Sequence, residues 1–413
     1  MGKTFLSLFS GFDKSEICQL YIYPTVPDVD VCSSYYRVTD KDVLDSILKF
    51  KKPGGELDKS KIVSAKKNLF ESDEDAKLYK RQRTSDPVKR LMRDAMWSLS
   101  HWYTKDLRTW LKREEPAAIF LSPGYAKFIY DIALKISKKL NIPIVTYICD
   151  DYYFVETPKT LVGKLQLSLL RKKTKALMKK TSYLITICDD IKQLYEKEFG
   201  VDSSVLMTGT TAGLSDGTRI SESPSSICYF GNISCRRYVS IAEIGRALDK
   251  LNTENGTSYE LKIYTGERDP DVLSVFDGIN SIRLCGFISG KEFENTLRAS
   301  DMLLHTEAFD KASIDLVKHS VSTKIADSLA SGIPLFAYGP EEVASMKHLI
   351  KHDAAIVCTS PERLEKTLAD AFCDKELRRR VAENGLATAR ERHDAGKNSK
   401  ILKALFKKPL KSN

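Results

Sequence analysis

The sequence contains no long hydrophobic run and no closely spaced pair of cysteines. No apolar stretch in the 413 residues approaches the length of about 20 residues that a membrane-spanning helix requires, and the N-terminus has no signal-peptide core. The nine cysteines are odd in number, include no C-x-x-C pair and mostly lie in strand-like segments, which predicts reduced core thiols rather than disulfides or zinc ligands. These absences exclude a disulfide-stapled secreted domain and predict a cytoplasmic protein.

Metal ligands and nucleotide-binding motifs are also scarce. Among the six histidines only His348 and His352 have a metal-like spacing, and because no third ligand is near them in the sequence, we expect two surface histidines on a helix and no metal site. Residues 2–4, Gly-Lys-Thr, lack the upstream glycine and strand of a P-loop. Since the basic residues are not interleaved with exposed aromatic ones, no nucleic-acid partner is expected.

Charged and apolar residues, by contrast, are plentiful. The 65 basic and 55 acidic residues give a net charge of +10, which favours anionic partners without saying which one, since nucleic acid, a nucleotide sugar and an anionic membrane surface all fit. The hydrophobic fraction of 42% is sufficient for a sizeable core in each of the about two or three domains that this length suggests.

The start of the chain is irregular. A short amphipathic helix over 2–12 is followed by a strand over 17–23. The segment 51–85 is dense in charge and poor in periodic apolar residues, which predicts a long mobile loop. A long helix is expected over 87–110, with its three tryptophans in packing roles.

From residue 117 onward, buried strands alternate with amphipathic helices. The predicted strands of this region are 117–121, 144–149, 183–188 and 204–207, and the helices between them are 125–140, 160–180 and 189–199. This alternation is typical of a parallel sheet with crossover helices. The strand and Gly-rich turn that normally open such a domain are absent, so we expect its first strand to be missing.

A segment rich in Gly, Ser and Thr, residues 208–226, marks a domain boundary. A second alternation follows it. Its predicted strands are 227–231, 260–264, 281–284, 301–306, 335–338 and 355–358. The pattern predicts a second parallel α/β domain.

Residues 299–340 are the most informative stretch of the chain. A strand over 301–306 is followed by polar residues up to Ser322, a helix that Gly332 and Pro334 terminate, and another strand. In an open α/β sheet, ligands bind outside the carboxyl ends of the strands, and a helix N-terminus attracts anions. We therefore expect the residues at this terminus to contact a phosphate, with an acidic residue one turn into the helix able to reach adjacent hydroxyls: Ser322, Thr323, Lys324 and Asp327.

This helix resembles the donor-site helix of GT-B glycosyltransferases of the family 4 (group 1) type, which has the pattern Ser-x-Lys-x-x-Glu-x-x-Ala-x-Gly-x-Pro. The matching positions are Ser322, Lys324, Asp327, Ala330, Gly332 and Pro334. Two features depart from the family, since Asp327 is shorter than the usual Glu and the gap between Glu307 and Asp327 exceeds the usual seven residues. An ordinary buried helix and turn is the alternative interpretation of this segment alone.

The resemblance implies an α/β fold of the GT-B type, with two Rossmann-like domains facing a cleft. The acceptor-side domain would cover 1–208 and the nucleotide-sugar donor domain 209–395. A C-terminal helix over 396–413 would cross back to the first domain.

The resemblance also implies which residues hold the donor. Gly231, Arg236 and Arg237 match a Gly-rich turn and the basic residues that bind the diphosphate, while Asn232 stands where the family often has Arg. A solvated arginine pair is the alternative. Phe287 and Ile288 would contact the nucleobase.

Three carboxylates are assigned roles by the same resemblance. Glu307 is expected to face the transferred sugar as a catalytic residue, and Asp327 to bind the ribose hydroxyls. Asp150, which Asp151 follows at a strand end, would accept a hydrogen bond from an acceptor hydroxyl. A helix cap or a solvated surface pair is the alternative for these two aspartates.

Taken together, these features predict a retaining, metal-independent glycosyltransferase of polysaccharide or glycoconjugate synthesis. It would need no cofactor beyond the nucleotide-sugar substrate and would act on a sugar or lipid-linked acceptor. The alternatives are a noncatalytic glycosyltransferase-like subunit and a GT-B sugar-nucleotide epimerase.

A basic helix over 161–180 predicts a peripheral membrane contact, at the inner face of the membrane. It has Leu161, Leu165 and Leu169 on one side and Lys and Arg at its C-terminal end. The alternative is a helix packed on the sheet, with solvated lysines that the helix dipole favours.

Overall fold

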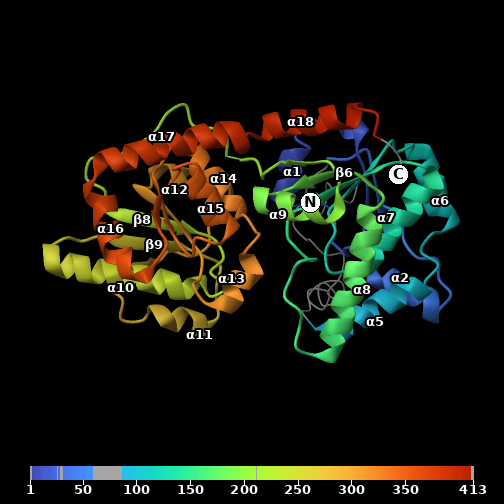
Figure 1. The fold of residues 1–413 in the computed structure, drawn as a ribbon, viewed down its shortest axis with the longest axis horizontal. Helices are drawn as coiled ribbons and strands as arrows, with labels where there is room; N and C mark the ends of the chain where they lie inside the picture. The colour runs from blue at the N-terminus through green and yellow to red at the C-terminus, as the bar shows by residue number, and fades with distance from the viewer. Residues whose placement is uncertain (1, 26, 28–30, 59–85, 211, 411–413) are drawn as a thin grey trace. The chain divides into compact units, whose positions relative to one another are not determined.

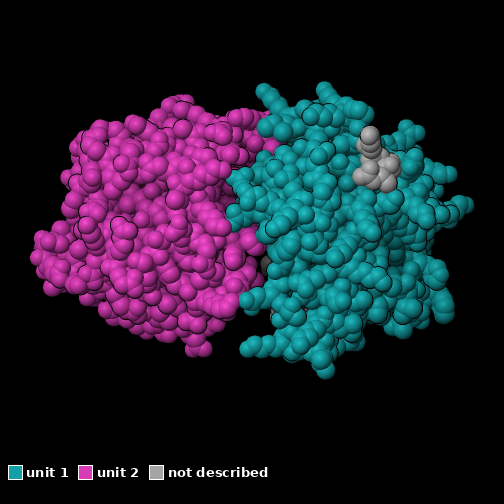
Figure 2. Space-filling view, in the orientation of Figure 1, with its two compact units in different colours: residues 1–205, 399–413 teal, residues 206–398 magenta. Residues whose placement is uncertain are grey.

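The computed structural model describes residues 2–25, 27, 31–58, 86–210 and 212–410. These residues form two compact units (Figure 2). The first comprises Met1–Val205 with Ser399–Asn413, and the second comprises Leu206–Asn398. The predicted loop over 51–85 lies largely outside the described residues, apart from its first part.

The main sheet of the first unit is parallel, with strand order β4-β5-β6-β7. Its strands are β4 Ile119–Leu121, β5 Ile144–Ile148, β6 Thr181–Thr186 and β7 Ser203–Val205, joined by α7 Lys127–Leu140, α8 Leu161–Met178 and α9 Asp189–Phe199. Every residue of β5 is buried, as expected for a parallel strand covered on both faces. The predicted alternation from residue 117 is confirmed.

A second, smaller sheet lies near the start of the chain, where β1 Cys18–Tyr21 pairs in parallel with β2 Ser34–Arg37 and β2 pairs antiparallel with β3 Gly55–Glu56. The helix α1 Lys3–Leu8 precedes this sheet, and α2 Asp40–Leu48 follows β2. Both the short N-terminal helix and the strand after it were predicted.

The long helix predicted over 87–110 is wrong, because two helices occupy this region. α5 is Pro87–Leu99 and α6 is Lys105–Glu114. The backbone of Ser100 is extended (φ −79°, ψ 153°) and ends α5, and the Thr104 hydroxyl accepts a hydrogen bond from the N–H of Leu107 at 3.1 Å and starts α6. The tryptophans do pack, since Trp97, Trp102 and Trp110 all belong to one buried cluster.

The second unit contains a six-stranded parallel sheet with the order β10-β9-β8-β11-β12-β13. Its strands are β8 Ser226–Phe230, β9 Glu260–Tyr264, β10 Ile282–Leu284, β11 Met302–Thr306, β12 Leu335–Tyr338 and β13 Ile356–Cys358. Each overlaps a predicted strand. The chain starts at β8, adds β9 and β10 on one side and then returns to place β11 on the other side, so the strand order reverses between β8 and β11. Ligands of open α/β sheets bind at such a switch point.

Helices surround this sheet (Figure 1). They are α10 Arg237–Asn255, α11 Pro270–Leu273, α12 Gly290–Ala299, α13 Lys311–Val317, α14 Thr323–Ala330, α15 Ala344–Lys351, α16 Leu364–Cys373 and α17 Lys375–Arg392. The last helix, α18 Ala395–Lys407, follows α17. The division between the two units falls inside α18, between Asn398 and Ser399. None of the helices in the described residues is long and apolar enough to cross a membrane.

The helix α13 was not predicted, because its sequence is too polar and too short for a clear periodicity. Its start depends on the Asp310 carboxylate, which accepts a hydrogen bond from the N–H of Ser313 at 3.1 Å. Ser313 and Val317 are buried on its inner side. The stretch expected to be an extended polar loop therefore contains a short capped helix.

Candidate functional site

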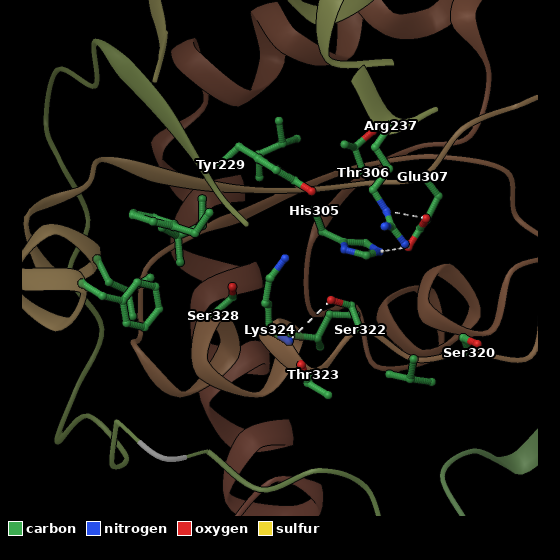
Figure 3. Close-up of a pocket in the computed structure, with 17 residues that line it drawn as sticks. Tyr229, Arg237, His305, Thr306, Glu307, Ser320, Ser322, Thr323, Lys324 and Ser328 are labelled. Atoms are coloured by element: carbon green, nitrogen blue, oxygen red, sulfur yellow. Dashed lines mark hydrogen bonds and ion pairs between the residues drawn. The ribbon is translucent and has the colours of Figure 1, made fainter. Parts of the chain in front are cut away.

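A pocket of about 220 Å³ lies at the switch point between β8 and β11 (Figure 3). Its walls come from the ends of both strands, from the turn before α14, from α12 and from the start of α10 and α14. The polar lining residues are Tyr229, Arg237, His305, Thr306, Glu307, Ser320, Ser322, Thr323, Lys324 and Ser328. The volume is below the range of roughly 300–1,000 Å³ typical of complete ligand sites, so the pocket suits one end of a larger ligand.

A buried ion pair dominates one side of the pocket. Arg237 donates from Nε and Nη2 to the two carboxylate oxygens of Glu307, at 2.8 and 3.0 Å. The side chain of Glu307 is only 3% exposed and that of Arg237 is 19% exposed. A bidentate pair in this environment fixes the orientation of the guanidinium.

The backbone holds Glu307 firmly in place. Its N–H donates to the carbonyl of Tyr338 at 3.0 Å, and its own carbonyl accepts from the hydroxyl of Ser240 at 3.0 Å. A Cβ at Gly339 would lie 3.2 Å from the Cβ of Glu307, so a larger residue would press against it. Burial raises the pKa of Glu307, while the nearby positive charges of Arg237 and Lys324 lower it in part.

Lys324 lies on the opposite side of the pocket, near the start of α14. Its ammonium group lies 5.8 Å from the centre of the Tyr229 ring and directly over Gly231. A Cβ at Gly231 would collide with the end of this side chain, and the φ of 129° at Gly231 is itself a conformation that favours glycine. Gly231 therefore lets the end of β8 and the lysine come together.

The turn between β8 and α10 determines which arginine enters the pocket. Cys235 and Arg236 both have a φ of 56°, in the left-handed region that residues with a side chain rarely adopt. Arg236 is then directed outward, with its side chain 57% exposed and its Nε 3.5 Å from Asp310. Arg237, the next residue, points inward.

The pocket has a positive electrostatic character. Among its lining residues the ionised side chains are Arg237, Lys324 and Glu307, two cations and one anion. The N-terminus of α14 adds the partial positive charge of the helix dipole, and its cap, Ser322, accepts a hydrogen bond from the N–H of Lys324 at 3.4 Å. This combination can bind a phosphate or diphosphate group.

His305 contributes no charge to this site. Burial, together with the positive charges of Arg237 and Lys324, lowers its pKa to about 3. Its Nε2 lies 3.0 Å from the hydroxyl of Ser345 and 3.8 Å from Oε1 of Glu307. The imidazole is neutral at physiological pH and acts as a hydrogen-bonding group.

The structure brings several of the predicted residues together. Arg237, Glu307, Ser322, Thr323 and Lys324 all line the pocket, and Gly231 lies against Lys324. These residues come from three separate segments of the chain.

Other predicted donor residues lie elsewhere. Arg236 is directed outward, and Asn232 is exposed, with its side-chain oxygen accepting from the N–H of Ser234 at 2.5 Å. Phe287 is 72% exposed and Ile288 half-buried, on the loop after β10, and neither lines the pocket. Their contact with a nucleobase stays a prediction.

Asp327 does not line the pocket either. It is 5% exposed and its Oδ1 accepts a hydrogen bond from the hydroxyl of Thr210 at 3.0 Å. Asp327 thus ties α14 to the segment that follows β7. Its proposed contact with ribose hydroxyls stays a prediction.

In the first unit, the paired aspartates after β5 differ from each other. Asp151 caps the following turn, where it accepts from the N–H groups of Tyr153 and Phe154 and from the hydroxyl of Tyr195. Asp150 is half-buried and accepts from the hydroxyl of Tyr152 at 3.3 Å. Asp151 is therefore structural, and the acceptor-binding role of Asp150 stays a prediction.

Sequence reasoning missed His305, Tyr229 and Ser240. His305 is a buried titratable residue two positions before Glu307, in a strand that begins with three apolar residues, and that exception was the available signal. Nothing in the sequence marks Tyr229, whose role depends on its position under Lys324.

No group of three or more described His, Cys, Asp or Glu residues could hold a metal ion. The expectation of two surface histidines on a helix is wrong for His348. Its Nε2 lies 3.0 Å from Nε2 of His393, in a half-buried contact at the end of α17. Burial lowers the pKa of His348 well below the ordinary value.

Comparison with known proteins gives both a sequence match and structural matches. The glycosyl transferase-like family matches residues 246–403, which include Glu307 and Lys324. No curated protein sequence matches the chain. Solved structures are similar at low identity. α,α-Trehalose 6-phosphate synthase from Burkholderia multivorans has a TM-score of 0.58 at 12% identity, over 98% of this chain and 92% of that one.

Two further structures cover less of the chain. Sucrose-phosphate synthase from Thermosynechococcus elongatus has a TM-score of 0.54 at 10% identity, over 76% of this chain and 78% of that one. Anabaena HepE in complex with UDP and glucose has a TM-score of 0.52 at 14% identity, over 72% of this chain and 80% of that one. Residues 246–403 thus form a glycosyl transferase-like region, and the chain has the two-domain α/β fold of the GT-B glycosyltransferases.

Proposed function

We propose that this protein is a glycosyltransferase that moves a sugar from a nucleotide-sugar donor to an acceptor hydroxyl. The observation that carries the proposal is the positive pocket at the switch point, where Arg237, Lys324 and the N-terminus of α14 converge. A nucleotide-diphosphate leaving group carries negative charge, and donors fixed around it stabilise that charge as it develops. A structurally similar protein, HepE, was solved with UDP and glucose.

In this proposal Arg237 and Lys324 contact the diphosphate from opposite sides. Both oxygens of Glu307 are bonded to Arg237, so these contacts support a positioning role for Glu307. Direct contact between Glu307 and the transferred sugar remains part of the proposal, because the carboxylate lines the pocket. Asp150 is proposed to accept a hydrogen bond from the acceptor.

The finer features of the proposal rest on the resemblance of the sequence to family 4. They are retention of configuration at the anomeric carbon, independence of a metal or other cofactor, a sugar or lipid-linked acceptor, and a role in polysaccharide or glycoconjugate synthesis. The location at the inner face of a membrane rests instead on the basic helix over 161–180. Product stereochemistry determined by NMR tests the first. Turnover that is unchanged by a chelator tests the second, and turnover that stops would contradict it.

Thermal unfolding with a panel of UDP-, GDP- and dTDP-sugars tests the donor directly. A ligand present at 100 times its Kd stabilises the folded state by about 2.7 kcal/mol. For a unit of this size that corresponds to a rise in Tm of roughly 5–11 °C. The release of nucleoside diphosphate on addition of an acceptor then tests transfer. A Lys324→Met variant should lose the Tm shift, and an unchanged shift would contradict the assigned site.

A noncatalytic glycosyltransferase-like subunit is the second candidate. One observation favours it, since Asp327, which occupies the position of the family's Glu, is engaged with Thr210. Donor binding without release of nucleoside diphosphate, across a broad set of acceptors, would support this candidate against the enzyme.

A further inference from the structure

Three neighbouring helices of the first unit have apolar side chains on their outer surfaces. α5 contacts both α2 and α8, and Figure 1 shows the three in one region of the first unit. The large hydrophobic side chains exposed on them are Leu44, Leu48, Val88, Met92, Leu99, Leu161, Val162, Leu165 and Leu169. We call these nine residues the three-helix face. Exposed apolar side chains gathered on neighbouring helices are typical of an interaction site.

The leucines of α8 are not required for its packing. The inner side of α8 is complete without them, because Leu167, Leu170 and Leu177 are at most 3% exposed. Leu161 and Leu165, one helical turn apart on the outer side, are 82% and 53% exposed. The helix therefore has one apolar stripe that faces the core and a second that faces outward.

α5 shows the same arrangement. Val88, Met92 and Leu99 are spaced so that they share one side of the helix, and all three are exposed. Asp94 and Trp97 are buried on the inner side. Two adjacent helices thus present outer apolar stripes in addition to their core contacts.

Basic residues predominate beside the leucines of α8, where Lys173 is paired with Asp131 and Lys175 with Glu198. Residues 157–188 contain eight basic residues and no acidic one. Lys164 and Lys172 are exposed on the outer side of α8, close to the leucines. On α2, Asp45 is mostly covered and is neutralised by ion pairs with Lys41 and Lys49.

We infer that the three-helix face docks on the surface of an anionic lipid bilayer. Leucines that project beyond a folded helix can enter the headgroup region, while long lysine side chains beside them reach lipid phosphates. A protein partner would need acidic residues to match so many lysines, and apolar residues to match the leucines. An anionic membrane supplies both at once.

The inference deepens the proposed function. It rests on that function only for the role of membrane binding, which would be to bring the enzyme to an acceptor at the membrane. Membrane binding itself needs no donor. The two tests are therefore independent. Absence of vesicle binding would refute the membrane inference alone, and absence of a Tm shift with nucleotide sugars would refute the proposed donor site alone.

Sedimentation with vesicles provides the test. The protein should bind phosphatidylcholine vesicles that contain phosphatidylserine, bind pure phosphatidylcholine vesicles far more weakly, and be released by high salt. The triple variant Leu161→Ser, Leu165→Ser, Leu169→Ser should reduce binding at least about tenfold. Because the replaced side chains are exposed, the variant should fold, which its unchanged Tm would verify.

Leu316→Ser is the matched control. Leu316 is 65% exposed but belongs to α13 in the second unit, so this variant should bind vesicles like the original protein. A second variant, Lys164→Gln with Lys172→Gln, should lose most of the dependence on phosphatidylserine.

Two results would overturn the inference. One is binding that is insensitive to anionic lipid and to the leucine replacements. The other is a concentration-dependent dimer that the triple variant abolishes, without any vesicle binding, which would assign the face to a second copy of the chain.

Discussion

The buried pair between Arg237 and Glu307 allows the strongest quantitative prediction. Arg237→Ala would leave the Glu307 carboxylate, which is 3% exposed, without its bidentate partner. Removing one member of a buried pair costs about 3–5 kcal/mol, because the remaining charge is uncompensated. For a unit of this size the expected fall in Tm is roughly 6–20 °C.

Arg236 is the matched control for this experiment. It is adjacent in sequence and has the same chemistry, but its side chain is 57% exposed and its contact with Asp310 is 3.5 Å long. Such exposed pairs contribute at most about 1 kcal/mol. Arg236→Ala should therefore change the Tm by only a few degrees.

A double variant isolates the charge from the packing. Arg237→Ala combined with Glu307→Gln removes both charges, so it should be less destabilised than Arg237→Ala alone. Urea unfolding followed by circular dichroism measures all of these free energies. Nucleotide affinity should fall with Arg237→Ala and stay nearly constant with Arg236→Ala.

Two results would refute this reasoning. The first is equal destabilisation by the two single variants. The second is nucleotide affinity that stays within about twofold for Arg237→Ala, a change of roughly 0.4 kcal/mol.

The remaining predictions concern the glycine, the histidine and the aspartate of the site. Gly231→Ala should lower both the Tm and the nucleotide affinity, because the new Cβ would displace Lys324 and strain the backbone; an unchanged affinity would contradict the close approach. His305 has a pKa of about 3 in the folded state, below its unfolded value of about 6.5, so acidification protonates the unfolded chain first. Between about pH 6.5 and the folded pKa, His305 should therefore lower the free energy of unfolding by about 1.4 kcal/mol for each pH unit of acidification. His305→Gln should remove this contribution to the pH dependence of the free energy of unfolding, measured by urea titrations. Asp327→Asn tests the ribose contact, with Thr210→Val as the control that removes only the hydrogen bond between the two side chains. A fall in nucleotide affinity with Asp327→Asn but not with Thr210→Val would support the contact. Equal effects of the two variants would leave a structural role for Asp327.

Much of the fold could be predicted because its strands are short, buried and separated by strong turn signals. β11 and β12 are apolar runs bounded by polar residues and by Gly332 and Pro334, and both were located to within a residue or two of their bounds. The break between α5 and α6 was missed, because Ser100 and Thr104 interrupt the apolar periodicity only weakly. The break becomes visible only in the structure, where the backbone of Ser100 is extended and Thr104 caps the start of α6.

The site was predictable in composition but not in detail. Two adjacent arginines in a sequence are equivalent, and only the left-handed backbone of Cys235 and Arg236 decides which of them turns inward. Asp327 was placed correctly on its helix, yet its partner, Thr210, is 117 residues away. Contacts at such separations depend on tertiary packing, which local patterns do not encode.

The order of strands around the pocket also determines when the site can form. β8 begins the second unit, but its partner β11, which pairs Met302 with Ile227, is made much later in the chain. Pairing between distant segments is slow because a long loop must close first. During synthesis the growing chain would therefore have β8, β9 and β10 in place with one side of β8 unpaired, and the ability to bind an anion would arise only as β11 and α14 join it. Nucleotide binding would accordingly report the completion of folding in this unit, not its beginning.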